Sequence, residues 1–395
     1  MRTQGRAGRF LRLLIVPLVL AGALLGAGPG AASAAACVSW TGMQPSAPAS
    51  PGFLIGAAVV SSCNAWAVGE YNNGTDYQTL IEHWNGSSWV QQPSPAPGSG
   101  NELGAVAATS ASNAWAVGIY VNGTPGQTLI EHWNGSSWAQ QPSADPGGPA
   151  GTNILYGVAA TSAGNAWAVG EYSNGTDYLS LIEHWNGTAW NVVPSPSVGT
   201  DRTLLNGVAV TSAKDAWAVG YYDPGNPDTD YQTLIEHWDG STWKIVPSPS
   251  PGGPDHANWL YSVAAISATN AWAVGDFNDG SKLQTLVEHW NGTTWKRVAS
   301  PGPGSVSNDL HGVTAISASN VWAVGGSYDG GADGGQTLIE HWNGTAWAQV
   351  PSPDPGAANG NNLFGVAAAS GRNIWAVGYY YPEAFTQQLL ALHCC

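Results

Sequence analysis

The amino-acid sequence predicts an all-β protein: a single seven-bladed β-propeller with four antiparallel strands in each blade. The tripeptide Trp-Ala-Val recurs seven times, at intervals of 49 to 55 residues. A second block, Glu-His-Trp, recurs six times, and an Asn-Gly or Asp-Gly pair follows each copy. Helical periodicity is absent. Repeats of about 51 residues, each with four short strands, are typical of a propeller.

The third copy illustrates the four strands of a repeat. A small apolar run at 157–160 turns through Ser-Ala-Gly-Asn into a second strand at 166–170. A longer loop leads to a third strand at 181–185, and an Asn-Gly turn leads to a fourth at 188–193. Asn-Gly between alternating strands predicts a type I′ hairpin turn, because both central residues of that turn need positive φ.

Tryptophan accounts for the unusual composition. The chain has 21 Trp but only 9% charged residues, and disordered chains are poor in aromatic side chains, so disorder is excluded. All but one of these Trp fall at fixed positions of the second, third or fourth strand, where we expect them to fill the widening gaps between outer strands. Trp259 alone stands outside the repeat and is therefore a candidate ligand-site residue.

The repeat resembles the kelch and galactose-oxidase-type propellers in its order of Gly, Tyr, Trp and Trp. In the first copy these are Gly69, Tyr71, Trp84 and Trp89. The paired glycines that follow the second strand in kelch repeats occur in one copy only, at Gly325-Gly326. The resemblance implies an architecture and no activity.

The first 36 residues are expected to be a secretory signal. Four arginines precede an apolar stretch at 13–26, and small residues at 32–36 provide cleavage sites. The stretch is too short to span a membrane, so we expect the mature chain 37–395 to be one domain, secreted, monomeric and without a transmembrane segment. The Arg-rich head and the Gly/Ala bias suggest a bacterial source.

The mature chain is strongly acidic. Without the four arginines of the signal, 26 acidic residues face 7 basic ones, a formal charge of −19. Such a surface repels phosphate backbones and lacks a basic stripe, which excludes nucleic acids as partners.

The two ends of the chain are predicted to share one blade. Residues 388–394 align with the third strand of the first copy (78–84), and residues 37–40 align with the start of its fourth strand (86–89). Three of the four cysteines lie at this break, in a chain expected to be exported. We expect Cys37 to bridge to Cys394 or Cys395, and Cys63 to bridge to the remaining one. A redox or metal cluster of free thiols is the alternative.

Seven histidines recur in the third strands, but symmetry places them in seven different blades. A metal needs three or four ligands within about 2–2.5 Å, so we expect no metal site and no cofactor. Each imidazole is expected to bond to the backbone or to the neighbouring blade. Whether the acidic turns at 223–230 and 329–333 bind Ca²⁺ is left open. The recurring histidines are His83, His132, His184, His237, His289, His341 and His393.

Comparison of the copies indicates which face of the disc is expected to bind the ligand. The loops between second and third strands and those between blades vary, and variable loops on a rigid scaffold are where binding usually occurs. Where each inner strand begins, the residue after Leu varies and is expected to rim the channel together with Trp259 and Asp309. These residues are Ile55, Gly104, Tyr156, Asn206, Tyr261, His311 and Phe364. A second aromatic ring follows the Trp-Ala-Val-Gly strands and includes Tyr71 and Tyr172.

These features favour an exported, non-catalytic binding or scaffold propeller. Its aromatic and Asp/Asn surfaces suit sugars. The expected ligand is a glycan or another extracellular protein. No Gly-x-Ser-x-Gly motif, Walker loop or diagnostic carboxylate pair is present. The alternative is a carbohydrate-active enzyme with one site at the channel mouth, where Asp309, His311, Glu70 or Glu171 would carry the chemistry. Clustered carboxylates at that mouth would favour the enzyme.

Overall fold

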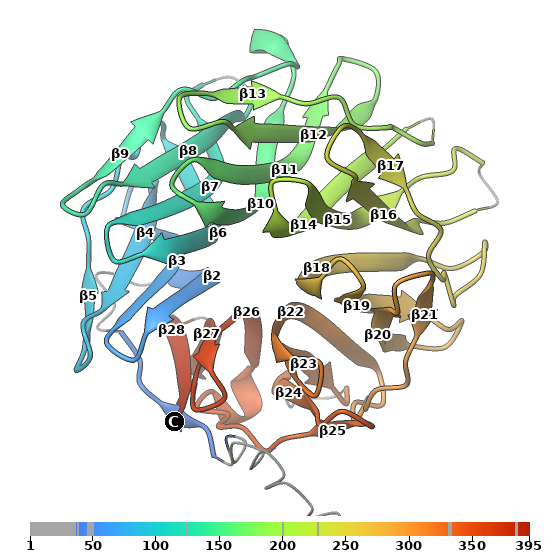
Figure 1. Ribbon diagram of the computed structural model, residues 1–395. Helices are drawn as coiled ribbons and strands as arrows, with labels where there is room; N and C mark the ends of the chain where they lie inside the picture. Colours follow the sequence, from blue (N-terminus) through green and yellow to red (C-terminus); the bar gives the residue numbers. More distant parts are fainter. Residues whose placement is uncertain are drawn as a thin grey trace, which may run out of the picture. The chain divides into compact units, whose positions relative to one another are not determined.

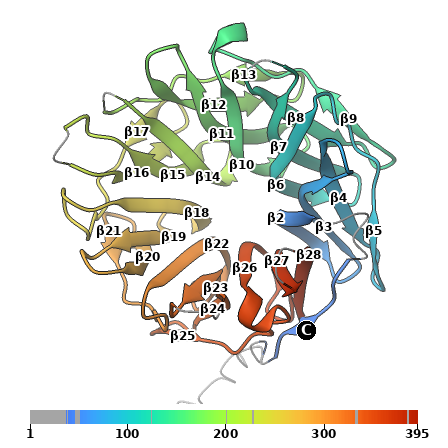
Figure 2. The same cartoon turned by 180° about the vertical axis from the view of Figure 1, so that it is seen from behind.

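Residues 37, 39–45, 51–123, 125–199, 201–226, 229–330, 334–383 and 386–395 are described by the computed structural model. They form seven four-stranded antiparallel sheets around one axis, which confirms the predicted fold class (Figures 1 and 2). The predicted signal segment 1–36 lies outside these residues, as does part of each acidic turn.

The first strand of each blade faces the axis (Figure 1). These inner strands are β2 (Gly52–Ser61), β6 (Gly100–Ser110), β10 (Asn153–Ser162), β14 (Thr203–Ser212), β18 (Asn258–Ser267), β22 (Ser307–Ser317) and β26 (Asn361–Ser370). The second strands are β3 (Asn64–Asn72), β7 (Asn113–Val121), β11 (Asn165–Ser173), β15 (Asp215–Tyr222), β19 (Asn270–Asn278), β23 (Asn320–Tyr328) and β27 (Asn373–Glu383).

The two outer strands of each blade are shorter. The third strands are β4 (Tyr77–Trp84), β8 (Gln127–Trp133), β12 (Tyr178–Trp185), β16 (Gln232–Trp238), β20 (Leu283–Trp290), β24 (Gln336–Trp342) and β28 (Thr386–Cys394). The fourth strands are β5 (Trp89–Gln91), β9 (Trp138–Gln141), β13 (Trp190–Val192), β17 (Trp243–Ile245), β21 (Trp295–Arg297), β25 (Trp347–Gln349) and β1 (Thr41–Gly42). Two 3₁₀ turns, η1 (Gly148–Ala150) and η2 (Ala357–Asn359), lie between blades.

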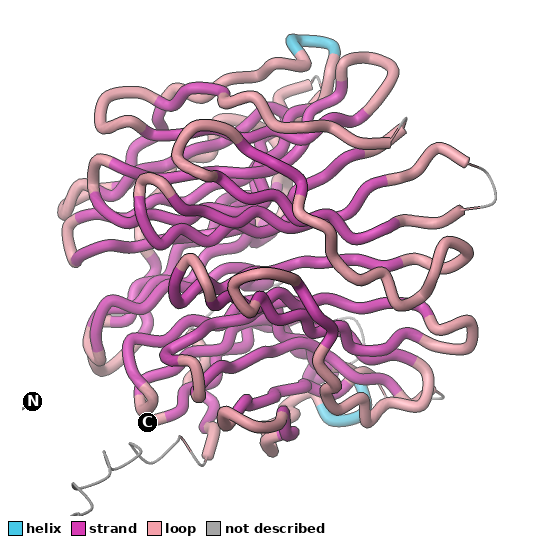
Figure 3. The backbone as a smooth tube through the Cα atoms, turned by 45° about the vertical axis from the view of Figure 1, so that its right-hand side comes forward, coloured by secondary structure: helices cyan, strands magenta, loops and turns pink. Residues whose placement is uncertain are grey.

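The loops gather at the two ends of the strands (Figure 3). We call the end where the inner strands begin the variable-loop face, and the end with the Asn-Gly turns the turn face. Within the described ranges, no helix has the length and apolarity needed to cross a membrane.

The turn between third and fourth strands is built differently from the type I′ prediction, which is wrong. Trp133 pairs with Trp138, so four residues form the loop. Within it only Gly135 has a positive φ, of 95°. The Oδ1 of Asn134 accepts hydrogen bonds from the backbone N–H groups of Ser136 and Ser137 at 2.9 and 3.1 Å. Asn is therefore required for its side chain and Gly for its backbone.

Tryptophans pack each blade onto the next, as predicted. Trp115 of β7 is 1% exposed, and its ring lies 4.9 and 5.1 Å from those of Trp185 and Trp190 in the following blade. Equivalent contacts recur around the ring, including Trp66 with Trp133 and Trp138. Large buried aromatic side chains thus supply the core between blades.

Six of the seven recurring histidines bond within their own blade, which corrects the prediction of a backbone or neighbouring-blade partner. His132 stacks on Trp115 at 4.2 Å, and its Nε2 lies 2.8 Å from Oδ1 of Asn113 at the start of the second strand. This explains the Asn or Asp two residues before Trp-Ala-Val in six copies; in the first copy the Nε2 of His83 has no hydrogen-bond partner among the described residues. The same pairing joins His184 to Asn165, His237 to Asp215, His289 to Asn270, His341 to Asn320 and His393 to Asn373.

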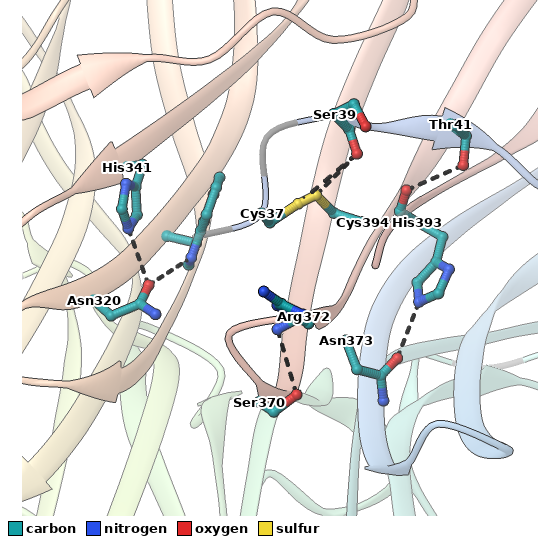
Figure 4. Close-up of a disulfide and its surroundings, with 11 residues drawn as sticks. Cys37, Ser39, Thr41, Asn320, His341, Ser370, Arg372, Asn373, His393 and Cys394 are labelled. Atoms are coloured by element: carbon teal, nitrogen blue, oxygen red, sulfur yellow. Dashed lines mark hydrogen bonds between the residues drawn. A yellow bond between two sulfur atoms is a disulfide. The ribbon is translucent and has the colours of Figure 1, made fainter. Parts of the chain in front are cut away.

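The ring closes as the alignment of the termini predicts. β1 pairs with β28, with Thr41 opposite His393, so the closing blade takes its outermost strand from the N-terminal end. Figure 4 shows the disulfide between Cys37 and Cys394 beside this pairing. Trp40 packs edge-on against Trp322 at 5.7 Å, as the fourth-strand Trp does elsewhere.

The second predicted bridge is not formed. Cys63 and Cys395 are both free and exposed. Cys63 lies in the β2–β3 turn against Gly86 of its own blade, whereas Cys395 follows β28 in the closing blade. Both cysteines belong to the turn face, which is what the alignment of the copies predicted. The alignment does not give the distance between residues of neighbouring blades, so it could not show that the two sulfur atoms do not meet.

We expect the Cys37→Ser variant to lose about 4–5 kcal/mol of unfolding free energy, since the bridge closes a loop of nearly the whole domain. Urea denaturation of the purified protein, with and without reductant, measures this loss. The Cys63→Ser/Cys395→Ser double variant is the matched control and should keep the native midpoint. Equal midpoints for all three proteins would contradict the assigned role of the bridge.

Candidate functional site

All seven inner strands carry a β-bulge at the same place. In the third blade the register shifts between Leu155 and Gly157, so Tyr156 has no partner in β11. A bulge bends the strand and redirects the extra side chain. The bulged residues are those that the sequence comparison singled out: Ile55, Gly104, Tyr156, Asn206, Tyr261, His311 and Phe364.

Two small residues make each bulge possible. Gly170, the Gly of Trp-Ala-Val-Gly, lies so close to β10 that a Cβ there would be 1.9 Å from the carbonyl oxygen of Ile154. Gly157 follows the bulge, and a Cβ there would be 2.7 Å from the carbonyl oxygen of Asn206 in the next blade. A Leu, the bulged residue and a small residue (Gly in five copies, Ala105 and Ser262 in the others), facing Trp-Ala-Val-Gly, therefore encode the bulge.

The seven bulged residues line a cavity on the axis. Its volume is about 270 Å³, and Glu102 also lines it. Tyr156, Tyr261, His311 and Phe364 of the predicted rim all border this space. The structure thus brings these four predicted residues together.

On one side of the cavity, three rings from consecutive blades form an arc. The ring centroids of Tyr261 and His311 are 5.1 Å apart, and those of His311 and Phe364 are 5.0 Å apart. Tyr379 continues the series at 5.7 Å from Phe364, and Tyr381 follows at 5.4 Å. We refer to Tyr261, His311 and Phe364 as the aromatic arc.

Two carboxyl groups support the arc. Oδ1 of Asp309 lies 3.2 Å from Nε2 of His311 and accepts a hydrogen bond from the Gly326 N–H at 2.9 Å. The Tyr261 hydroxyl bonds to Asp276, whose side chain is almost fully buried. Burial, with a smaller contribution from the nearby Asp309, raises the pKa of Asp276 to about 7. Asp276 is therefore partly protonated at neutral pH.

On the opposite side, an ion pair fixes one carboxylate. Arg202 of the fourth blade donates to both oxygens of Glu171 in the third, at 2.8 Å from Nε and 2.5 Å from Nη2. The Tyr156 hydroxyl donates to the same carboxylate at 3.1 Å. Glu171 is 1% exposed and has three donors, so it serves the structure rather than a reaction.

Glu70 and Glu102 form a second acidic element. Burial raises the pKa of Glu70 to about 7, and the charge of Glu102 adds to this shift. Burial also raises the pKa of Glu102. The negative charge of Glu102 therefore opposes the ionisation of Glu70.

The other predicted residues lie away from the cavity lining. Trp259 stands opposite Asp276 in the β18–β19 pairing, with its ring 6.3 Å from that of Tyr231. Tyr71 and Tyr172 pack into the apolar clusters between blades. The second aromatic ring is thus core material, as buried aromatic side chains commonly are.

Sequence comparison missed Asp276, Glu102 and Arg202. Asp276 directly follows Trp-Ala-Val-Gly, at the position that holds Glu70 and Glu171 in other copies. The variation of that position among copies was a usable signal. For Arg202 no such signal was present in the sequence, because its partner Glu171 lies in another blade. In the described part of the chain, no three His, Cys, Asp or Glu side chains converge as metal ligands do.

Comparison with known proteins supports the architecture. No family model matches the chain, and no curated protein matches it in sequence. Among solved structures, YCF48 bound to D1 peptide is similar, with 15% identity, a TM-score of 0.54, and coverage of 91% of this chain and 99% of that one. YCF48 from Cyanidioschyzon merolae is similar at 13% identity, a TM-score of 0.53, and coverage of 90% and 98%.

A third similar structure is a catalytically inactive variant of virginiamycin B lyase from Staphylococcus aureus with quinupristin. It is 11% identical, with a TM-score of 0.55 and coverage of 90% of this chain and 99% of that one. Such low identities show the fold alone. These propellers are not specifically of the kelch or galactose-oxidase type, so only the seven-bladed architecture of that resemblance is supported.

Proposed function

We propose that the protein is an exported binding propeller with one ligand site in the axial cavity. One observation carries this: the seven copies agree at the positions that build the blades and differ at the seven bulged residues that line the cavity. Seven equal side chains around an axis would make a symmetric surface. Six residue types over the seven positions, with Tyr at two of them, make a single asymmetric site.

The ligand is a glycan or an extracellular peptide. The similar YCF48 structure contains a D1 peptide, and the lyase structure contains quinupristin, so this architecture holds a peptide elsewhere, whereas the glycan alternative rests on the aromatic cavity lining. The Cys37–Cys394 bridge supports an oxidising location, because disulfides persist outside the cytosol.

Filling the cavity is the test. Gly104 is the bulged residue without a side chain, and a Cβ there would be 3.4 Å from its nearest neighbour, an ordinary contact. We expect Gly104→Phe to weaken the ligands found by glycan-array and peptide-library screens by about ten-fold or more. Wild-type protein should bind one ligand per chain, because such sites are few per protein.

Gly164→Ser on the turn face is the matched control. Serine or a similar residue occupies the equivalent position in other copies, and a Cβ at Gly164 has no neighbour closer than 4.0 Å. This variant should bind as wild type does. Unchanged binding by Gly104→Phe, or several equal sites per chain, would overturn the axial-site proposal.

A second candidate function is glycan hydrolysis, favoured by the protonatable Asp276 beside the Asp309–His311 pair. Paired carboxyl groups with different proton affinities are the machinery of glycosidases. If the protein is such an enzyme, Asp276→Asn will lower the release of reducing ends from bound glycan by about a hundred-fold while binding persists. Binding without any release by wild-type protein leaves the non-catalytic function.

A further inference from the structure

We propose that the axial site takes one saccharide residue that is neutral or carries an amino group, and that it rejects anionic sugars. This inference rests on the proposed binding function and names its ligand class. It is carried by the aromatic arc, by the polar groups around it and by the size of the cavity.

The aromatic arc provides an apolar wall that spans three consecutive blades. Tyr261, His311 and Phe364 all border the cavity, and neighbouring rings are tilted by 42° and 51°. A tilted series of rings makes a curved surface rather than a single flat face. The C–H faces of a sugar ring are apolar and broad enough to lie on such a surface.

The charged side chains at and behind the cavity lining are carboxyl groups. Glu102 is the acidic residue among the described lining residues, whereas Asp309 and Asp276 do not line the cavity themselves but are bonded to the lining residues His311 and Tyr261. A ligand that satisfies acceptors must itself donate, through hydroxyl or ammonium groups. A sugar without carboxylate or phosphate has this character.

Positive charge for an anionic ligand is not provided. Lys and Arg are absent from the residues that border the cavity, so far as the structure describes them. Arg202 does not line the cavity, and its Nε and Nη2 already donate to Glu171. A bound carboxylate or sulfate would face Glu102 without a lysine or arginine as counter-charge, which opposes its binding.

The cavity size limits the bound unit. A volume of about 270 Å³ is below the usual range for drug-sized ligands, which is roughly 300–1,000 Å³, and suits a single ring. Tyr379 and Tyr381 extend the ring series beyond the cavity, so a longer oligosaccharide has further aromatic contacts outside. A lysine-rich peptide would satisfy the carboxyl groups, but one ammonium group covers only one ring of the three.

Calorimetric titration of the full secreted protein with four probes tests the proposal. The probes are a glucosamine trimer, a panel of neutral glucose, galactose and mannose trisaccharides, trigalacturonic acid, and a lysine-rich peptide. We expect the amino trimer or a neutral trisaccharide to bind at one per chain, and trigalacturonic acid to bind at least about ten-fold more weakly.

Phe364→Leu keeps an apolar side chain but removes the ring from the arc, and should weaken the sugar by about ten-fold. Phe277→Leu is the matched control, since Phe277 is buried outside the cavity beneath Arg297. His311→Gln provides a second variant of the arc with hydrogen-bonding capacity retained. Thermal unfolding shows whether each variant is folded.

The outcomes separate this proposal from the proposed function. Equal binding of trigalacturonic acid and the neutral sugars, or sugar binding indifferent to Phe364→Leu and His311→Gln, overturns the saccharide assignment. Binding of the lysine-rich peptide alone, abolished by Gly104→Phe, overturns the saccharide but retains the axial site. Binding of any probe that is indifferent to Gly104→Phe overturns both.

Discussion

Replacing Gly170 with alanine is expected to cost more than about 4 kcal/mol of unfolding free energy, a loss few single substitutions reach. The added Cβ would lie 1.9 Å from the carbonyl oxygen of Ile154, and backbone on both sides prevents a small side-chain adjustment from relieving the overlap. The bulge at Tyr156 must then rearrange. We expect ligand affinity at the axial cavity to fall with stability, because the bulge orients the cavity lining.

Gly104→Ala is the control for this substitution. It also adds a single methyl group to the bulge region, but its nearest neighbour would be 3.4 Å away. It should change the free energy of unfolding by less than about 1 kcal/mol, measured by urea titration. If Gly170→Ala behaves like Gly104→Ala, the requirement for glycine opposite the bulge is wrong.

Six buried carboxyl groups give the second large expected effect. The Glu of Glu-His-Trp is at most 1% exposed in every copy. Its contacts reach the loop after the fourth strand of the preceding blade: Glu236 accepts hydrogen bonds from Ser195 at 3.0 Å, and Glu183 from the Ala144 N–H at 3.3 Å. Neither oxygen of Glu131 has a partner among the described protein groups.

These groups should make the propeller less stable as pH rises. Burial raises the pKa of Glu131 to about 9. The unfolded chain ionises this group above pH 4.5 or so, whereas the folded chain keeps it protonated, so stability is complete below that pH and is lost as pH rises toward 9. At pH 8 the cost of Glu131 is on the order of 4 kcal/mol.

The Glu131→Gln variant isolates this effect. We expect it to match wild type near pH 4 and to exceed it by about 3–4 kcal/mol near pH 8, in free energies from urea titration. The difference between the two proteins is the useful quantity, because burial lowers the pKa of His132 and of the equivalent His83, His184, His289, His341 and His393, and so weakens the fold toward acid. This histidine contribution is common to both proteins.

Glu236→Gln is the matched comparison. Ser195 donates to Glu236, and the pKa of Glu236 is raised less, to about 8. The unfolding free energy gained by Glu236→Gln near pH 8 should therefore be smaller than that gained by Glu131→Gln. A gain of equal size at pH 4 and pH 8 for either variant would show that ionisation is not its cause.

Much of the fold could be predicted because each contact is repeated. Trp115 and its six counterparts recur at intervals of 49 to 55 residues. This repeat revealed seven blades before any strand pairing was known. Aligning Trp40 with the other fourth-strand tryptophans placed β1 correctly beside β28. The aligned termini also placed Cys37 next to the end of the chain, where Cys394 is its partner.

Contacts whose partners no repeated pattern aligned could not be predicted. The Cys63–Cys395 bridge failed because the alignment specifies a face of the disc but not a distance across blades. Arg202 meets Glu171 only because β14 begins beside β11 of the previous blade. The histidine partners were also missed, since residues 19 to 22 positions apart become neighbours only through strand register.

By itself the sequence determined the all-β class, the number of blades, the position of closure and the ring of variable residues near the axis. A repeat supplies these because local turn preferences and apolar patterning act in the same way in every copy. Only the tertiary structure decided which of those residues share one cavity. A β-bulge shifts the register by one residue, which redirects a side chain toward the axis, and that shift depends on how closely Gly170 and Gly157 let neighbouring backbones approach.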